Sequence, residues 1–478
     1  MIDKLTEKGI RLSLDAEQII KEKNDAGIVD KIIALGKPLI TRQDVESLFS
    51  EKEKELKVEV RQASDFIPLA KEYESRIEII HTRDVTGKSR TKGEVENFVS
   101  YFRNRYSRIA RFLRTPGGES LIDLKDIKRY LNERVRINVM VSSKKETKKG
   151  NLLLEVEDLT GSFKVVFSSN SKNEKLADKA KGILLDEVIS ISGKVLEPYI
   201  IADDIDWPEI PVMRERKKAE NDLAIAYLSD THFGSRYFLE KEFKSFVDWM
   251  HGRGEARELA GKVKYVIVAG DLVDGIGIYP NQEKELVVKD IYAQYKMFDD
   301  FVESLPDWVE VIISPGNHDA VRRGEPMPAI GKDLISSDVT SVGNPSTVVV
   351  EGLKHLIYHA TSIDSMIASL PNASYSHPEK VMVEYLRRRH LSPIYGGNLI
   401  IPENIDYMVV DEEPDVLHCG HVHKNGYTQY RGTLLINSGT FQDRTEFQIK
   451  QGHVPSPALV PVYEIKSGKL RTLDFKSA

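Results

Sequence analysis

The stretch Leu223-Ala-Ile-Ala-Tyr-Leu-Ser-Asp-Thr-His232 shows the pattern that decides the fold: an apolar run ends, and polar residues of metal-binding types follow at once. The pattern recurs further along the chain. Gly270-Asp271-Leu-Val-Asp274 follows the apolar run Tyr265–Ala269, and Gly316-Asn317-His318-Asp319 follows Val309–Ile313. Continuous apolar runs of this kind are typical of strands that are buried on both faces.

Two later strand ends repeat the pattern, one with His359 and one with Gly420-His421-Val-His423. The further apolar runs are Leu356–Tyr358, Val416–Cys419 and Leu434–Ile436. Helical periodicity lies between the runs, around residues 240–250 and 289–304. Residues 220–478 are therefore predicted to form an α/β domain whose functional groups gather on loops at strand ends.

Five of the twelve histidines lie in these loops, beside aspartates and an asparagine. One strand that ends in Asp or His usually marks a structural hydrogen bond, but five successive ones predict a shared site. Imidazole, carboxylate and amide ligands suit divalent manganese, iron or zinc. Two such ions ~3.5–4 Å apart can support an in-line phosphoryl displacement, with a carboxylate as the natural bridge. The predicted metal-binding residues are Asp230, His232, Asp271, Asn317, His359, His421 and His423.

Composition limits the partners and the compartment. The net charge of −6 argues against indiscriminate binding of nucleic acid, so any DNA affinity must come from local patches or from a partner. Cys419 is the only cysteine, which excludes an internal disulfide and a cysteine-based zinc site. No apolar run approaches the ~18–20 residues that span a bilayer, and the first residues lack the pattern of a secretory signal. We expect a cytoplasmic protein with no membrane partner.

Residues 1–50 are predicted to form a small helical domain. Apolar residues recur at helical spacing over 28–35, and Thr41 is a candidate cap for a second helix that runs through Leu48. Residues 51–125 are predicted to be a linker followed by an amphipathic, basic helix.

The region 51–125 opens with mixed charges over 51–57 and contains a short strand-like piece at 77–80. An aromatic, basic segment follows, with apolar residues at helical intervals. Two interpretations stay open: a helix packed on a neighbour, or a helix with one side facing nucleic acid. The segment contains Phe98, Tyr101, Phe102, Arg103, Arg105, Tyr106, Arg108, Arg111 and Phe112.

Residues 126–210 change to the alternating pattern of half-buried strands. The alternation is seen over 135–141 and 152–157, and a turn at Gly161 leads into a third strand. A short helix and a strand near 188–193 follow. This order suits a small five-stranded oligonucleotide/oligosaccharide-binding (OB) barrel, although other small antiparallel barrels or sandwiches fit as well. Its first hairpin offers lysines either to single-stranded DNA or simply to solvent: Lys144, Lys145, Lys148 and Lys149.

The strand-end motifs resemble those of the calcineurin-like metallophosphoesterase superfamily, in the same order, over roughly residues 222–478. The resemblance implies that Asp230, His232 and His423 ligate one metal ion. It likewise assigns a second ion to the set Asn317, His359 and His421, with Asp271 as the bridge between the ions.

The same resemblance makes His318 the catalytic acid, which protonates the leaving oxygen and is oriented by a carboxylate. Asp274 is expected to support a ligand, and Asp319 to orient His318. Ala360 stands after His359 where the family pattern has glycine.

The combination of barrel and phosphoesterase resembles the small subunit of archaeal D-family DNA polymerase. The stretches that carry this resemblance are Asp84-Val-Thr-Gly-Lys-Ser89, Arg387-Arg-Arg-His-Leu391, Tyr395-Gly-Gly397 and Asn437-Ser-Gly-Thr-Phe-Gln442. The resemblance implies a multidomain α/β protein: an N-terminal helical extension, an OB-like barrel and a calcineurin-like sandwich.

The resemblance also implies a function. The chain would be the proofreading 3′–5′ exonuclease subunit of a two-subunit replicative polymerase. It would use two divalent ions, with manganese expected and iron or zinc as alternatives. Its partners would be the large catalytic subunit, in a heterodimer or heterotetramer, and single-stranded DNA with primer 3′ ends, in a nucleoid-associated location.

Two other functions stay open: a non-catalytic scaffold of a replicative complex, and a stand-alone enzyme for small phosphoesters. The intact ligand set argues against the scaffold. The barrel and the N-terminal region would have no purpose in the stand-alone enzyme.

Overall fold

The computed structural model describes residues 2–23, 27–35, 37–45, 66–113, 120–169, 174–212, 214–451 and 453–476. The chain divides into two compact units, residues 1–65 and 66–478. The predicted continuation of a helix through Leu48 and the charged run 51–57 lie outside the described residues. Among the helices of these ranges, none is long and apolar enough to cross a membrane.

The first unit is helical, as predicted, and has its own core. Its elements are α1 (Ile2–Glu7), α2 (Leu14–Lys23) and α3 (Ile28–Ala34), with the short parallel pair β1 (Arg11–Leu12) and β2 (Leu39–Ile40). Leu5, Ile20 and Ile32 are among the buried residues of the core. The Asp44 carboxylate accepts hydrogen bonds from the Thr41 backbone and hydroxyl groups at 2.9 and 2.8 Å.

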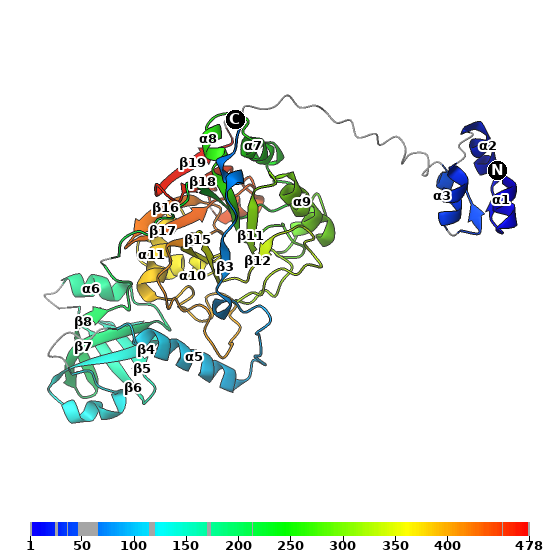
Figure 1. Ribbon diagram of the computed structural model, residues 1–478. Coiled ribbons are helices and arrows are strands. Elements are labelled where there is room, and N and C mark those ends of the chain that lie inside the picture. Colours follow the sequence, from blue (N-terminus) through cyan, green and yellow to red (C-terminus); the bar gives the residue numbers. More distant parts are fainter. Residues whose placement is uncertain are drawn as a thin grey trace. The chain divides into compact units, whose positions relative to one another are not determined.

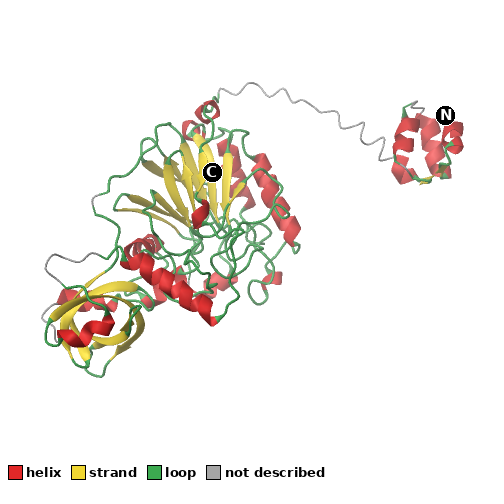
Figure 2. Ribbon diagram, turned by 60° about the horizontal axis from the view of Figure 1, so that its bottom comes forward, coloured by secondary structure: helices red, strands yellow, loops and turns green. Residues whose placement is uncertain are grey.

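Two six-stranded sheets form the centre of the second unit (Figures 1 and 2). In spatial order, the first contains β12 (Thr340–Ser341), β11 (Glu310–Ser314), β10 (Val263–Ala269), β9 (Ala224–Leu228), β18 (Leu459–Glu464) and β19 (Lys469–Asp474). The second contains β16 (Asn425–Tyr430), β17 (Thr433–Ser438), β15 (Val416–Cys419), β14 (Leu353–Ile357), β13 (Ser346–Val350) and β3 (Ile77–Ile79). Strand β3 comes from the region before the barrel.

The sheets are buried on both faces, which explains the continuous apolar runs. Along β10, Tyr265 and Ile267 belong to the core between the sheets, while Val266 and Val268 pack with the helices outside. The first sheet is covered by α7 (Glu240–Met250), α8 (Arg257–Ala260) and α9 (Ile291–Ser304), and the second by α10 (Ile363–Ser369) and α11 (Pro378–Arg388). A further helix, α12 (Glu446–Gln451), precedes β18.

The strands that carry the polar motifs run parallel. β9, β10 and β11 are parallel neighbours in the first sheet, and β14 and β15 are parallel neighbours in the second. Their carboxyl ends therefore meet at one edge of the sandwich.

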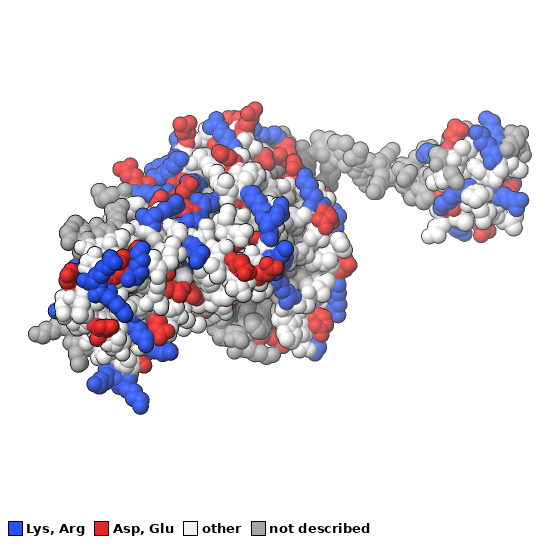
Figure 3. Space-filling model, turned by 90° about the horizontal axis from the view of Figure 1, so that it is seen from below, with Lys and Arg blue, Asp and Glu red and all other residues white. Residues whose placement is uncertain are grey.

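The barrel has five strands and is closed, as the alternating pattern predicted (Figure 2). The order β4-β5-β6-β8-β7 joins β4 (Arg134–Glu146), β5 (Leu152–Glu157), β6 (Ser162–Phe167), β8 (Tyr199–Asp206) and β7 (Val188–Leu196), with α6 (Glu174–Lys181) between β6 and β7. Lys144 is engaged rather than free, because its ammonium group donates hydrogen bonds to the carbonyls of Lys181 and Ile183 at 2.9 and 2.7 Å. On the face of the molecule shown in Figure 3, basic side chains (blue) and acidic side chains (red) are interspersed.

The basic segment forms α5 (Val95–Ala110). Arg105 is fully buried, with Nε 2.8 Å from Oδ2 of Asp406 and a nitrogen 2.7 Å from the Pro393 carbonyl. Arg108 and Arg111 both pair with Asp411. The helix is thus packed on the two-sheet sandwich through its arginines, which is the first of the two interpretations.

The motif at 387–391 also has a structural role. Arg388 Nε lies 2.6 Å from Glu187 Oε2 at the start of β7, so this ion pair ties α11 to the barrel. Burial raises the pKa of Asp406, but His390 and Arg105 outweigh burial and hold that pKa below its usual range.

Arg105→Met should lower the free energy of unfolding by about 3–5 kcal/mol, because it removes the guanidinium partner of the buried Asp406 carboxylate and leaves only the His390 imidazole beside it. The matched control is Arg134→Met, since the Arg134–Asp203 pair is about half exposed and should contribute at most about 1 kcal/mol. Urea midpoints of the full chain measure both. Equal shifts for the two variants would contradict a special role for the buried pair.

Candidate metal centre

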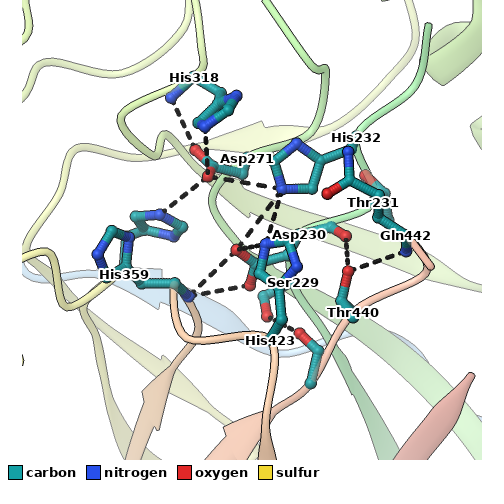
Figure 4. Close-up of polar contacts among 12 residues, drawn as sticks. Ser229, Asp230, Thr231, His232, Asp271, His318, His359, His423, Thr440 and Gln442 are labelled. Atoms are coloured by element: carbon teal, nitrogen blue, oxygen red, sulfur yellow. Dashed lines mark hydrogen bonds and ion pairs between the residues drawn. The ribbon is translucent and has the colours of Figure 1, made fainter. Parts of the chain in front are cut away.

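The predicted ligands come together at the edge where the parallel strands end. Five of them are buried and are labelled in Figure 4: Asp230, His232, Asp271, His359 and His423. The structure groups Asp230 with His232 and His423, and Asp230 with Asp271 and His359, with ligand atoms close enough in each group to share an ion. A third group joins His232, Asp271 and His318.

Asp271 occupies the middle of the site. Its Oδ2 lies 3.2 Å from His359 Nε2 on one side and 3.8 Å from His232 Nε2 on the other. A carboxylate in this position can bridge two ions. Burial raises the pKa of Asp271, but the imidazoles of His359 and His318 outweigh burial and hold it well below the usual range.

The first ligand set surrounds Asp230. His423 Nε2 lies 3.4 Å from Asp230 Oδ1 and 3.0 Å from His232 Nε2. His232 Nε2 lies 3.9 Å from the same carboxylate oxygen. The three side chains thus point their ligand atoms at a common point.

The second ligand set surrounds the Asn317 amide oxygen. His359 Nε2 lies 3.1 Å from this oxygen, and His421 Nδ1 lies 3.0 Å from it. All seven predicted ligands thus lie together.

The donor atoms fit a pair of cations. His359 Nδ1 lies 2.8 Å from the Ala269 carbonyl, which requires the ring proton on Nδ1 in the neutral imidazole. The lone pair of Nε2 then faces the oxygens of Asp271 and Asn317. Burial lowers the pKa of His359, but the Asp271 carboxylate outweighs burial and raises it to about 10, so that without a cation a proton on Nε2 faces these oxygens. A divalent ion would take the place of that proton.

Each remaining imidazole nitrogen has an orienting partner. His232 Nδ1 lies 3.0 Å from Asp274 Oδ1, in agreement with the supporting role expected of Asp274. His421 Nε2 lies 3.0 Å from Asp364 Oδ2.

The third such contact is made by His423, whose Nδ1 lies 2.8 Å from Gln448 Nε2. Asp364 and Gln448 were not predicted from the sequence, because each lies on a helix with no motif around it.

His318 is placed beside Asp271 but is held differently from the prediction. Its backbone N–H donates to Asp271 Oδ1 at 2.8 Å, and its Nδ1 lies 2.7 Å from the Asp274 carbonyl. The orienting group is therefore a backbone carbonyl, which corrects the expected carboxylate. Its Nε2 lies 4.0 Å from Asp271 Oδ2. Burial lowers the pKa of His318.

Asp319 does not orient His318, so that prediction was wrong. The Asp319 carboxylate instead accepts hydrogen bonds from the Gly316 backbone at 2.8 Å and the Tyr295 hydroxyl at 3.2 Å. It thereby fixes the loop that carries Asn317. Burial, together with the charge of Asp271, raises the pKa of Asp319 to about 7.

The backbone at the site is strained. Five of the seven predicted ligands adopt the left-handed region, which non-glycine residues rarely occupy. Their φ angles are 51° for Asp230, 49° for His232, 51° for Asp271, 73° for His421 and 54° for His423. Ala360 also has a left-handed φ of 79°, which explains the family preference for glycine there. Sharp turns directly after the strands thus aim the side chains inward.

Gly316→Ala should abolish hydrolysis while the protein stays folded. A Cβ at residue 316 would lie 2.2 Å from Asp271 Oδ1 and would displace the central carboxylate. Metal content and the rate of phosphoester hydrolysis test this expectation, and a thermal melt shows whether the variant is folded. Gly352→Ala is a matched control for the added methyl group, since a Cβ there meets no atom within 4 Å, although its φ of 76° adds strain. Full activity in Gly316→Ala would contradict the central role of Asp271.

The fold and the site define a calcineurin-like phosphoesterase, and the profile of that family matches residues 223–425. Membership implies divalent metal ions at the site. Similar curated proteins show which group of calcineurin-like phosphoesterases the chain belongs to. The DNA polymerase II small subunit of Methanothermobacter thermautotrophicus is 36% identical over 99% of both chains. That of Archaeoglobus fulgidus is 42% identical, over 80% of this chain and 78% of the relative. The chain belongs to the family of archaeal DNA polymerase II small subunits.

Proposed function

We propose that this subunit is a 3′–5′ exonuclease that removes mispaired ends during DNA synthesis. The observation that carries the proposal is the complete ligand set, which a purely structural subunit would not need. The left-handed backbone at five of the ligands costs about 1–3 kcal/mol of stability for each residue. Such strain persists mainly at sites where function requires it.

In the proposed mechanism, Asp230, His232 and His423 would hold one ion and Asn317, His359 and His421 the other, with Asp271 placed to contact both. Manganese is the proposed ion. Two cations held there would supply an attacking hydroxide and stabilise the charge on the phosphate. Asp274, Asp364 and Gln448 fix the imidazole rings so that the ligand nitrogens stay aimed inward.

His318 is proposed to protonate the leaving oxygen. Its Nδ1–H donates to the Asp274 carbonyl, so Nε2 carries a transferable proton only in the imidazolium form, which the anionic phosphate of a bound substrate would favour against burial. The side chain is 14% exposed, which gives it access to a substrate at the site.

We further propose that the large catalytic subunit is the partner, that single-stranded DNA and primer 3′ ends are the substrates, and that the complex is associated with the nucleoid. Polymerase activity needs such a partner, because hydrolysis is the chemistry that the described residues support. With a net charge of −6, the chain also gains from a partner that holds the duplex.

The test is incubation of the full chain with manganese and single-stranded DNA that carries either a 3′ or a 5′ label. Stepwise loss from the 3′ end, abolished by a chelator, is expected. In complex with the large subunit, the chain should remove mispaired 3′ ends before extension. Degradation from the 5′ end alone, or none with metal bound, would overturn the proposal.

A further inference from the structure

Two aromatic side chains that the proposed mechanism does not use lie beside the metal centre. Tyr375 comes from the loop between α10 and α11, and His453 from the loop between α12 and β18. Their ring centroids are 4.0 Å apart, with an angle of 37° between the ring planes. Both residues are partly exposed. Tyr375 packs on the core beneath α10 and α11 and still leaves part of its side chain exposed.

Tyr375 is connected to the second ligand set. Its phenol interacts electrostatically with the Asp364 carboxylate, whose Oδ2 lies 3.0 Å from His421 Nε2. Burial, together with the charge of Asp364, raises the pKa of Tyr375 to about 12. The ring is therefore held near His421 while its hydroxyl stays protonated.

His453 is connected to the first ligand set. Its backbone N–H donates to the Gln448 carbonyl at 2.9 Å, and the Gln448 side chain contacts His423 Nδ1 at 2.8 Å. Lys424 holds the same loop, since its ammonium group donates to the Val454 carbonyl at 3.3 Å. Burial lowers the pKa of His453, which keeps its ring neutral at pH 7.

Asp364 thus lies between Tyr375 and the ligand His421, and Gln448 lies between His453 and the ligand His423. A nucleotide whose phosphate lies at the metal centre places its base one sugar away. Partly exposed aromatic rings beside a phosphate-binding site are groups on which proteins stack unpaired bases without regard to sequence.

We propose that Tyr375 and His453 form a stacking platform for the terminal base of a single-stranded DNA end while its phosphodiester is cleaved. This inference rests on the proposed exonuclease function and adds how the DNA substrate is held. A base reaches the platform only after it leaves the duplex stack, so the platform selects frayed or mispaired ends.

The test uses the full chain with manganese and 3′-labelled single strands. Tyr375→Leu should raise KM by roughly 5- to 100-fold, since stacking of one base contributes about 1–3 kcal/mol. Tyr375→Phe keeps the ring and should change KM by less than about 2-fold. Tyr73→Leu is the matched control, because this partly exposed tyrosine follows Ala70, whose N–H donates to the Gly261 carbonyl just before β10 begins, at the opposite end of that strand from the metal centre.

A second substrate isolates the stacking contact. On a strand that ends in an abasic residue, the wild-type chain has no terminal base to stack, so Tyr375→Leu should make little further difference. His453→Leu should behave like Tyr375→Leu on both substrates.

Three outcomes would overturn the platform. One is an unchanged KM for Tyr375→Leu in a chain that degrades DNA. Another is an equal loss on the abasic strand, and the third is a loss in Tyr375→Phe as large as in Tyr375→Leu, which would assign the effect to the hydroxyl and Asp364. A wild-type chain that binds metal yet leaves single strands intact would instead overturn the proposed function and the platform together.

Discussion

Asp271→Ala should lower the hydrolysis rate by at least ~10³-fold and remove most of the bound metal, because metal ions contribute several kcal/mol to such reactions. The carboxylate lies between His359 and His232, so its loss leaves both ligand sets without their shared member. Metal analysis of the purified variant and a rate assay on labelled DNA check the two expectations.

Asp299→Ala is the control for the loss of a buried carboxylate. Asp299 is also nearly buried and is bound by Ser336 and Ser337, but it lies within α9 rather than at the strand ends. The Asp299→Ala variant should have a lower free energy of unfolding and an unchanged metal content. Retention of metal in Asp271→Ala would contradict the bridging position.

His318→Ala should have the opposite balance of effects. We expect the metal content to stay near the wild-type value and the rate to fall by ~10²–10⁴-fold, which is the usual contribution of a general acid. The side chain touches the site through Asp271 and is fixed by the Asp274 carbonyl, so its removal leaves all seven predicted ligands in place.

The comparison of the two variants decides the role of His318. If His318→Ala lost its metals as completely as Asp271→Ala, His318 would be a ligand. The third group of possible ligand atoms, which contains His318, makes this comparison necessary.

Much of the phosphoesterase fold could be predicted from the sequence, because both faces of its central strands are buried. The runs Tyr265–Ala269 and Val416–Cys419 fall within β10 and on β15. The seven ligands could also be placed together, since each follows a strand directly and parallel strands end at one edge.

Other features depend on contacts between distant segments, which no local pattern records. Helices α1 and α2 were missed, as were Asp364 and Gln448. Asp319 was assigned to His318 because the two are adjacent in sequence, but it bonds Gly316 and Tyr295. The basic segment could not be assigned without the structure, because a buried Arg105 and a DNA-facing arginine look alike in a sequence.

Strand β3 pairs with β13 through Ile79 and Val348, although the barrel separates the two strands in the chain. The barrel is therefore an insertion inside the phosphoesterase, entered after β3 and left before β9. A truncation at residue 220 would remove β3 and leave β13 as a bare edge, which invites association with other edges. Dissection of the subunit should instead delete the barrel and join its two flanks, so that the recombinant core keeps all strands of both sheets.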